Sequence, residues 1–73
     1  MDETTISFCL MKMGRSFEEA LIACLIYDKG IDYVREFVKK TGMSDSDKDD
    51  TIIYLEELWD ETKAVIHSQE PIE

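Results

Sequence analysis

The fold is decided by the sequence SFEEALIACLIYD at residues 16–28. Ser16 and Glu19 have the spacing of a capping box, in which the serine hydroxyl accepts from the backbone N–H of Glu19 and the glutamate bonds back to Ser16. This pattern predicts a helix from Phe17 to about Asp28. A buried strand is the alternative for an apolar run of this length, and the capping box and the two alanines favour the helix. Because residues 20–27 are apolar on every side, we expect this helix to be central and buried all round.

Glycines on both sides of this stretch predict two further short helices. Thr4 or Thr5 is expected to cap the first helix, which runs to about Lys12 and ends at Gly14, because glycine commonly follows a helix C-terminus. The third helix occupies about 31–41 and ends before Gly42. Residues 1–42 are therefore expected to form a three-helix body.

The last part of the chain predicts one longer amphipathic helix. Residues 43–50 form an acidic connection, in which Ser44 or Ser46 can cap the helix that follows. That helix runs from about Asp49 to His67, with its regular amphipathic part at 51–67 and a flexible tail at 68–73. The chain is thus predicted to be a single all-α domain, a small bundle of four short helices.

The charge of the chain is concentrated on this last part. Residues 1–43 carry seven acids and six bases, whereas residues 44–73 carry ten acids and two bases, so that nearly all of the net charge of −9 lies after residue 43. Such a charge would repel nucleic acid and anionic membranes, so neither is expected as a partner. The asymmetry favours a protein partner with a basic surface.

The composition argues against catalysis, cofactor binding and export. The chain has one histidine, no glycine-rich phosphate loop and no zinc-binding arrangement of cysteine and histidine, so we predict neither an enzyme nor a cofactor. Cys9 and Cys24 lie in apolar surroundings and are expected to be reduced and buried. No signal peptide or membrane-spanning run is visible, which predicts a cytoplasmic protein. The sequence leaves the oligomeric state open.

A helical wheel places most acids of the fourth helix on its outer side. Rows of carboxylates can imitate nucleic-acid phosphates and occupy the basic cleft of an RNA polymerase or a nuclease. The size and charge resemble those of small acidic phage proteins that inhibit host enzymes in this way. The alternative is an outer face kept acidic for solubility. The predicted partner-binding residues are Asp49, Asp50, Ile53, Glu56, Glu57, Asp60 and Glu61.

The first half of the chain offers a different functional hypothesis. It resembles a ubiquitin-associated (UBA) domain, a compact three-helix module, over about residues 5–39, through Leu10-Met11-Lys12-Met13-Gly14, Glu19-Ala20, Ala23-Cys24, Gly30-Ile31-Asp32, Val34 and Phe37-Val38. The family usually has an aromatic residue after Met-Gly, where this chain has Arg15. The resemblance implies UBA-like packing of the first three helices, and ubiquitin or ubiquitin-like binding by Met13, Gly14, Arg15, Phe37 and Val38.

Residues 45–56 also resemble the calcium-binding loop of an EF-hand. Asp45, Asp47 and Asp49 occupy the first, third and fifth loop positions, and Glu56 occupies the twelfth. The sixth position, where the family has glycine, is Asp50. The main prediction is that the protein binds no metal, and a degenerate calcium site is the second alternative function. The competing interpretation of this segment is an acid-rich helix N-terminus.

Overall fold

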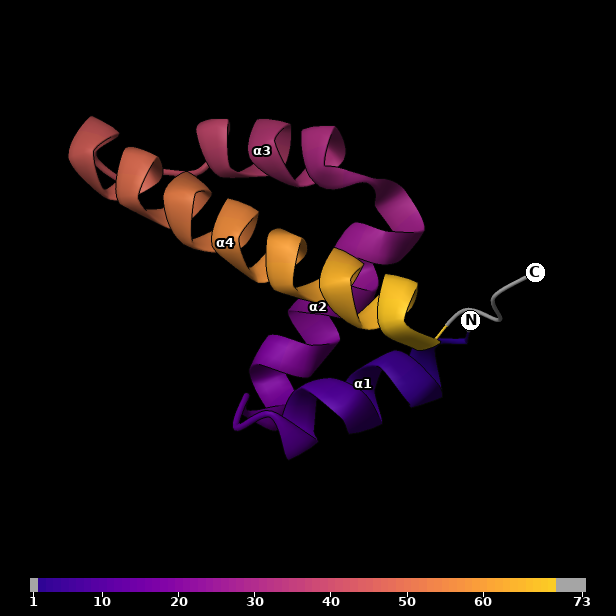
Figure 1. Ribbon diagram of the computed structural model, residues 1–73. Helices are drawn as coiled ribbons and strands as arrows, with labels where there is room; N and C mark the ends of the chain where they lie inside the picture. Colours follow the sequence, from indigo (N-terminus) through magenta and orange to yellow (C-terminus); the bar gives the residue numbers. More distant parts are fainter. Residues whose placement is uncertain (1, 70–73) are drawn as a thin grey trace.

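The computed structural model describes residues 2–69, which form four α-helices and no strand (Figure 1). The helices are α1 (Glu3–Lys12), α2 (Phe17–Lys29), α3 (Ile31–Lys39) and α4 (Asp45–Gln69). This confirms the predicted all-α bundle. No helix in the described part of the chain is long and apolar enough to span a membrane. Residues 70–73 of the predicted tail lie outside the described residues.

The capping box predicted at the start of α2 is present. The Glu19 backbone N–H donates to Ser16 Oγ at 3.1 Å, and the Ser16 N–H donates to Glu19 Oε1 at 3.0 Å. The turns on either side of α2 contain Gly14 and Gly30, with φ of 101° and 95°. Glycine adopts these left-handed values at little cost because it has no Cβ.

Two predicted helix starts need correction. The first helix begins at Glu3, because the Asp2 carboxylate rather than Thr4 or Thr5 caps it by accepting from the Thr5 N–H at 2.8 Å. The fourth helix begins at Asp45, so most of the predicted connection at 43–50 is helical. Ser44 Oγ accepts from the Asp47 N–H at 3.2 Å, and acids in a first turn interact favourably with the helix dipole. At its other end α4 extends past His67 to Gln69.

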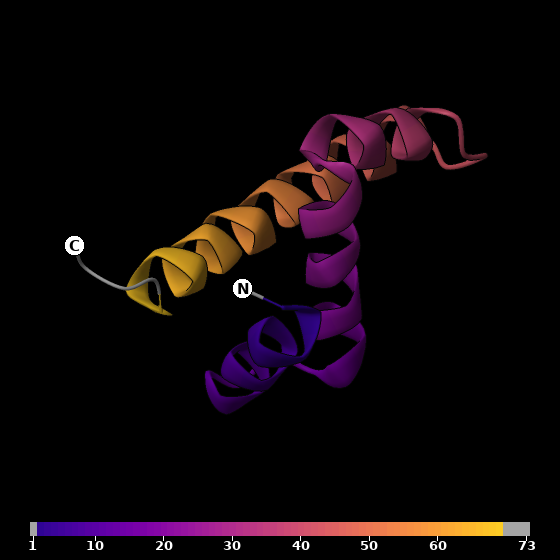
Figure 2. The same ribbon diagram turned by 90° about the vertical axis from the view of Figure 1, so that its right-hand side faces the viewer.

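Helices α2 and α4 organise the bundle. Each contacts all three other helices, whereas α1 and α3 do not contact one another within the described chain. The first half of α4 runs beside α3, and its second half passes over α2 towards α1 (Figure 1). In Figure 2, α1 and the C-terminal half of α4 lie on the same side of the upright helix α2.

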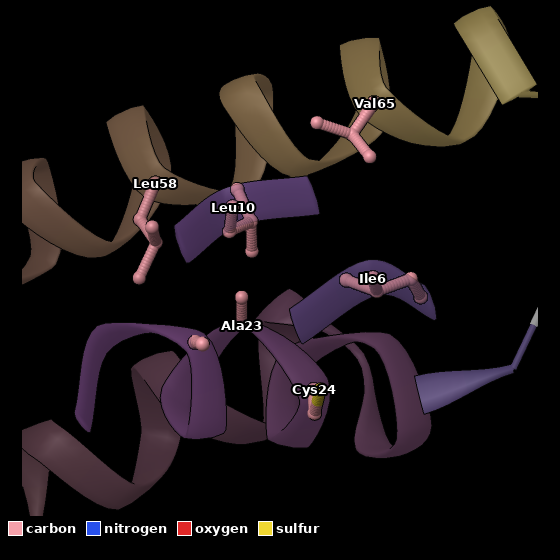
Figure 3. Close-up of a cluster of buried hydrophobic side chains, with 7 residues drawn as sticks. Ile6, Leu10, Ala23, Cys24, Leu58 and Val65 are labelled. Carbon is pink, nitrogen blue, oxygen red and sulfur yellow. The ribbon is translucent and has the colours of Figure 1, made fainter. Parts of the chain in front are cut away.

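The core consists of two neighbouring clusters. In the first, side chains of α1, α2 and α4 meet (Figure 3), namely Ile6, Leu10, Ala20, Ala23, Cys24, Leu58 and Val65. The second joins α2, α3 and α4 through Ile26, Val34, Val38 and Leu55. Ile22 packs against both clusters. The spacing of the buried residues of α4 leaves the opposite side of that helix in solvent.

The prediction that the second helix is buried all round is wrong. Phe17, Leu21 and Leu25 lie four residues apart on α2 and are exposed. The physical reason is geometric: α1 and α4 pack on one side of α2, and a chain of this size has no further helix for the other side. Helix α2 is therefore central by its contacts but apolar on both its covered and its uncovered side.

Candidate protein-binding surface

The outward side of α4 presents an apolar side chain surrounded by carboxylates. Ile53 is 55 % exposed. On a helix surface the neighbours of a residue are those three and four positions away, which for Ile53 are Asp49, Asp50, Glu56 and Glu57. Every one of these neighbours is an acid, so the isoleucine is the apolar centre of a negatively charged surface.

Most of these acids have no countercharge within the protein. The carboxylates of Asp49, Asp50 and Glu57 are exposed and make no ion pair or hydrogen bond with any residue in the range 2–69. Asp60 Oδ1 lies 3.3 Å from Lys63 Nζ, and both side chains are well exposed. We call Asp49, Asp50, Ile53, Glu57 and Asp60 the acidic face.

Two of the acids assigned to partner binding have internal roles instead. Glu56 Oε2 lies 3.3 Å from Arg35 Nη2 of α3. Glu61 accepts from Arg15, whose Nε lies 3.1 Å from Glu61 Oε2. These ion pairs connect the two flanks of α4 to the body, so Glu56 and Glu61 are not part of the acidic face.

A polar network surrounds Arg15. Its guanidinium bonds Glu61 of α4 and, at 2.9 Å, Glu19 of α2, and the hydroxyl of Tyr54 donates to the same Glu19 oxygen. The Ser16 N–H and the Tyr54 hydroxyl, together with Arg15, stabilise the Glu19 carboxylate and lower its pKa to about 2. Burial, together with the adjacent Glu19 carboxylate, raises the pKa of Tyr54. The bonds from Glu61 and Glu19 raise the pKa of Arg15. This network ties α4 to the start of α2.

The residues implied by the UBA resemblance are not brought together. Met13 and Phe37 are exposed, but they belong to the ends of α1 and α3, two helices that do not contact one another in the described part of the chain. Val38 is buried in the second core cluster, and Arg15, next to Gly14, is held by Glu61 and Glu19. The arrangement of the helices does not identify the module, so the resemblance stays a prediction.

The calcium-site alternative requires a loop at residues 45–56, and the structure has a helix there. Within this helix Asp45 and Asp49 lie on one side, because they are four residues apart, and Asp47 lies on the opposite side. No group of three side chains with metal-binding chemistry is found among residues 2–69. The resemblance arises because an acid-rich helix N-terminus repeats aspartate at the same short spacing.

Comparison of the chain with protein-family models, with curated protein sequences and with solved structures found no significant match.

Proposed function

We propose that the protein is a non-catalytic regulator that binds a basic surface of a larger protein through the acidic face of α4. The observation that supports this proposal is the exposed Ile53 among four acidic neighbours. An exposed isoleucine adds nothing to solubility, so a surface kept acidic for solubility does not account for it. A binding surface needs one, because apolar contacts at the centre of an interface provide affinity while charges around them provide orientation and a fast encounter.

The class of target follows from the charge and shape of this face. A straight helix with carboxylates along one side matches a groove lined by lysine and arginine, the kind that holds a nucleic-acid backbone. We infer that the target is a nucleic-acid-processing enzyme, such as RNA polymerase or a nuclease, and that the protein inhibits it as small phage proteins do. Ubiquitin-type recognition has less support, because Val38 is buried and Arg15 is already bound internally.

The proposal can be tested with two variants of equal charge. The face variant carries Asp49→Asn, Asp50→Asn and Glu57→Gln, and the control variant carries Glu3→Gln, Glu18→Gln and Asp28→Asn at exposed acids elsewhere. Each protein is immobilised and incubated with bacterial and eukaryotic lysates. Bound proteins are eluted with stepwise salt and identified by mass spectrometry.

We expect one specific protein with a basic surface to be retained by the wild type and by the control variant, and to be lost from the face variant. It should leave the wild type at moderate salt, because exposed charge pairs are screened beyond a Debye length of about 8 Å at physiological ionic strength. Equal retention by the face variant and the control variant would refute the proposal. Ubiquitin conjugates retained by all three proteins through the salt steps would move the function to the first three helices.

A further inference from the structure

A group of exposed apolar side chains lies away from α4, on the uncovered side of α2 and the adjoining side of α3. We call Phe17, Leu21, Leu25, Tyr33 and Phe37 the apolar face; their side chains are between 45 and 65 % exposed. Leu25, Tyr33 and Phe37, with Val34, line a hollow of about 110 Å³. Neither the proposed function nor the core accounts for this face.

We propose that the apolar face is the interface of a homodimer, in which two copies of this chain are related by a twofold axis near Leu21. A twofold interface must be self-complementary, because the same surface meets itself. The apolar face satisfies this requirement, since the projecting side chain of Phe17 lies at one end of its stripe on α2 and the hollow beside Leu25 lies at the other. Rotation about an axis near Leu21 brings the Phe17 side of one copy to the hollow of the other.

The area of the face is sufficient for a dimer. Aromatic residues have about 150–250 Å² of surface each and leucines somewhat less, so these three aromatic and two leucine side chains at their exposures present roughly 500 Å². Complete burial of these residues in two copies would remove about 1,000 Å² from solvent, which is the smallest area expected of a biological interface. A contiguous apolar patch of this size on a small protein is commonly a binding site.

The distribution of charge also favours a second copy over a basic partner at this face. Its rim contains both signs, with Glu36 and Lys40 beside Tyr33 and Phe37, whereas the uncompensated acids are on α4. Helix α4 packs on the other side of α2. A dimer through the apolar face therefore places two layers, the α2 helix of each copy, between the two acidic faces. With helix axes about 9 Å apart, the two α4 helices would be separated by about 27 Å, which is several Debye lengths.

The test is sedimentation velocity of the full chain at increasing concentration, with variants that add a charge to each face. We expect wild type to approach twice its chain mass of 8.5 kDa at micromolar concentration, and added salt not to weaken the dimer, because the interface is apolar. Leu21→Glu should weaken dimerisation by about 100-fold or more, since each substitution occurs twice in a twofold interface. Phe37→Glu, on α3, should act in the same way.

Ile53→Glu is the matched control, because it introduces the same charge at an exposed apolar residue of the acidic face. It should leave the dimer intact, and all three variants should keep wild-type helicity by circular dichroism. A wild-type monomer at about 500 µM, or a Leu21→Glu protein that dimerises as wild type does, would overturn the proposal. Capture of the regulatory target tests α4 separately, since Leu21→Glu leaves the acidic face unchanged.

Discussion

Replacing Leu58 by alanine tests the orientation of α4, on which the acidic face depends. Leu58 is fully buried in the first core cluster, where it faces Leu10 and Ala23 (Figure 3). The substitution removes three carbon atoms, worth about 0.8 kcal/mol each, and leaves a cavity that adds a further penalty. We therefore expect the free energy of unfolding to fall by about 3 kcal/mol.

This loss is large for a chain of this length. At about 0.05–0.15 kcal/mol per residue, the whole domain is stable by roughly 4–11 kcal/mol. Its unfolding entropy is about 0.15 kcal/mol/K near the melting temperature, so Leu58→Ala should lower Tm by about 20 °C. Urea and thermal unfolding followed by circular dichroism measure both quantities, and protein concentration must be held constant because a dimer would raise the apparent stability.

Ile53→Ala is the control on the same helix. Ile53 points into solvent, so its truncation should change stability by no more than about 0.5 kcal/mol. If Ile53→Ala cost as much as Leu58→Ala, or if Leu58→Ala cost less than about 1 kcal/mol, α4 would be rotated about its axis relative to the structure. The assignment of the acidic face would then be wrong.

Three further predictions concern the charged side chains. A double-mutant cycle with Arg15→Ala and Glu61→Ala, measured by urea unfolding, should give a coupling free energy of about 1 kcal/mol. If the two substitutions lowered the free energy of unfolding by strictly additive amounts, the pair would not hold α4. The pKa of Glu19 is about 2 in the folded state, below its ordinary value of 4.5. As the pH falls, the unfolded chain therefore takes up a proton at Glu19 before the folded chain does. The stability that Glu19 contributes is complete above pH 4.5 and is lost as the pH falls towards 2. Glu19→Gln should reduce the slope of stability against pH in that window, and an unchanged slope would contradict the assigned network. Glu57→Lys should raise the stability of the helix by about 0.5 kcal/mol, because it converts repulsion from Asp60 and Glu61 into attraction, and a loss in thermal unfolding experiments would contradict this account.

Local signals in the sequence were sufficient to predict the number of secondary-structure elements and that all of them are helices. The capping box at Ser16 located the start of α2, and Gly14 and Gly30 located the turns on either side of it. The sequence alone places the start of α4 too late, because four aspartates between residues 45 and 50 suggest a loop by intrinsic propensity. In the folded chain the cap from Ser44 and the helix dipole outweigh that propensity.

Burial and pairing could be predicted only in part, because both depend on residues distant in the sequence. The wheel correctly indicated that Ile53 lies among acids, since this follows from helical spacing alone. It could not indicate that Glu61 bonds Arg15, a residue 46 positions earlier. Nor could periodicity show that Leu21 and Leu25 are exposed, because an apolar residue on α2 is buried only where another helix covers it.

The ion-paired acids of α4 stabilise the folded protein, whereas its unpaired acids destabilise it. The arrangement of the two groups bears on function. Arg15 and Arg35 neutralise acids on the two flanks of the helix and fix it to the body. Between those flanks Glu57 lies three residues before Asp60, and this like-charge pair costs about 0.2–0.5 kcal/mol. A protein that required only solubility could distribute the same charge over its whole surface without this local repulsion. Concentrating it around one exposed isoleucine lowers the stability of the free protein, and the repulsion is relieved when a basic surface neutralises the face. A target should therefore stabilise α4 as it binds, and a variant such as Glu57→Lys should gain stability while losing affinity.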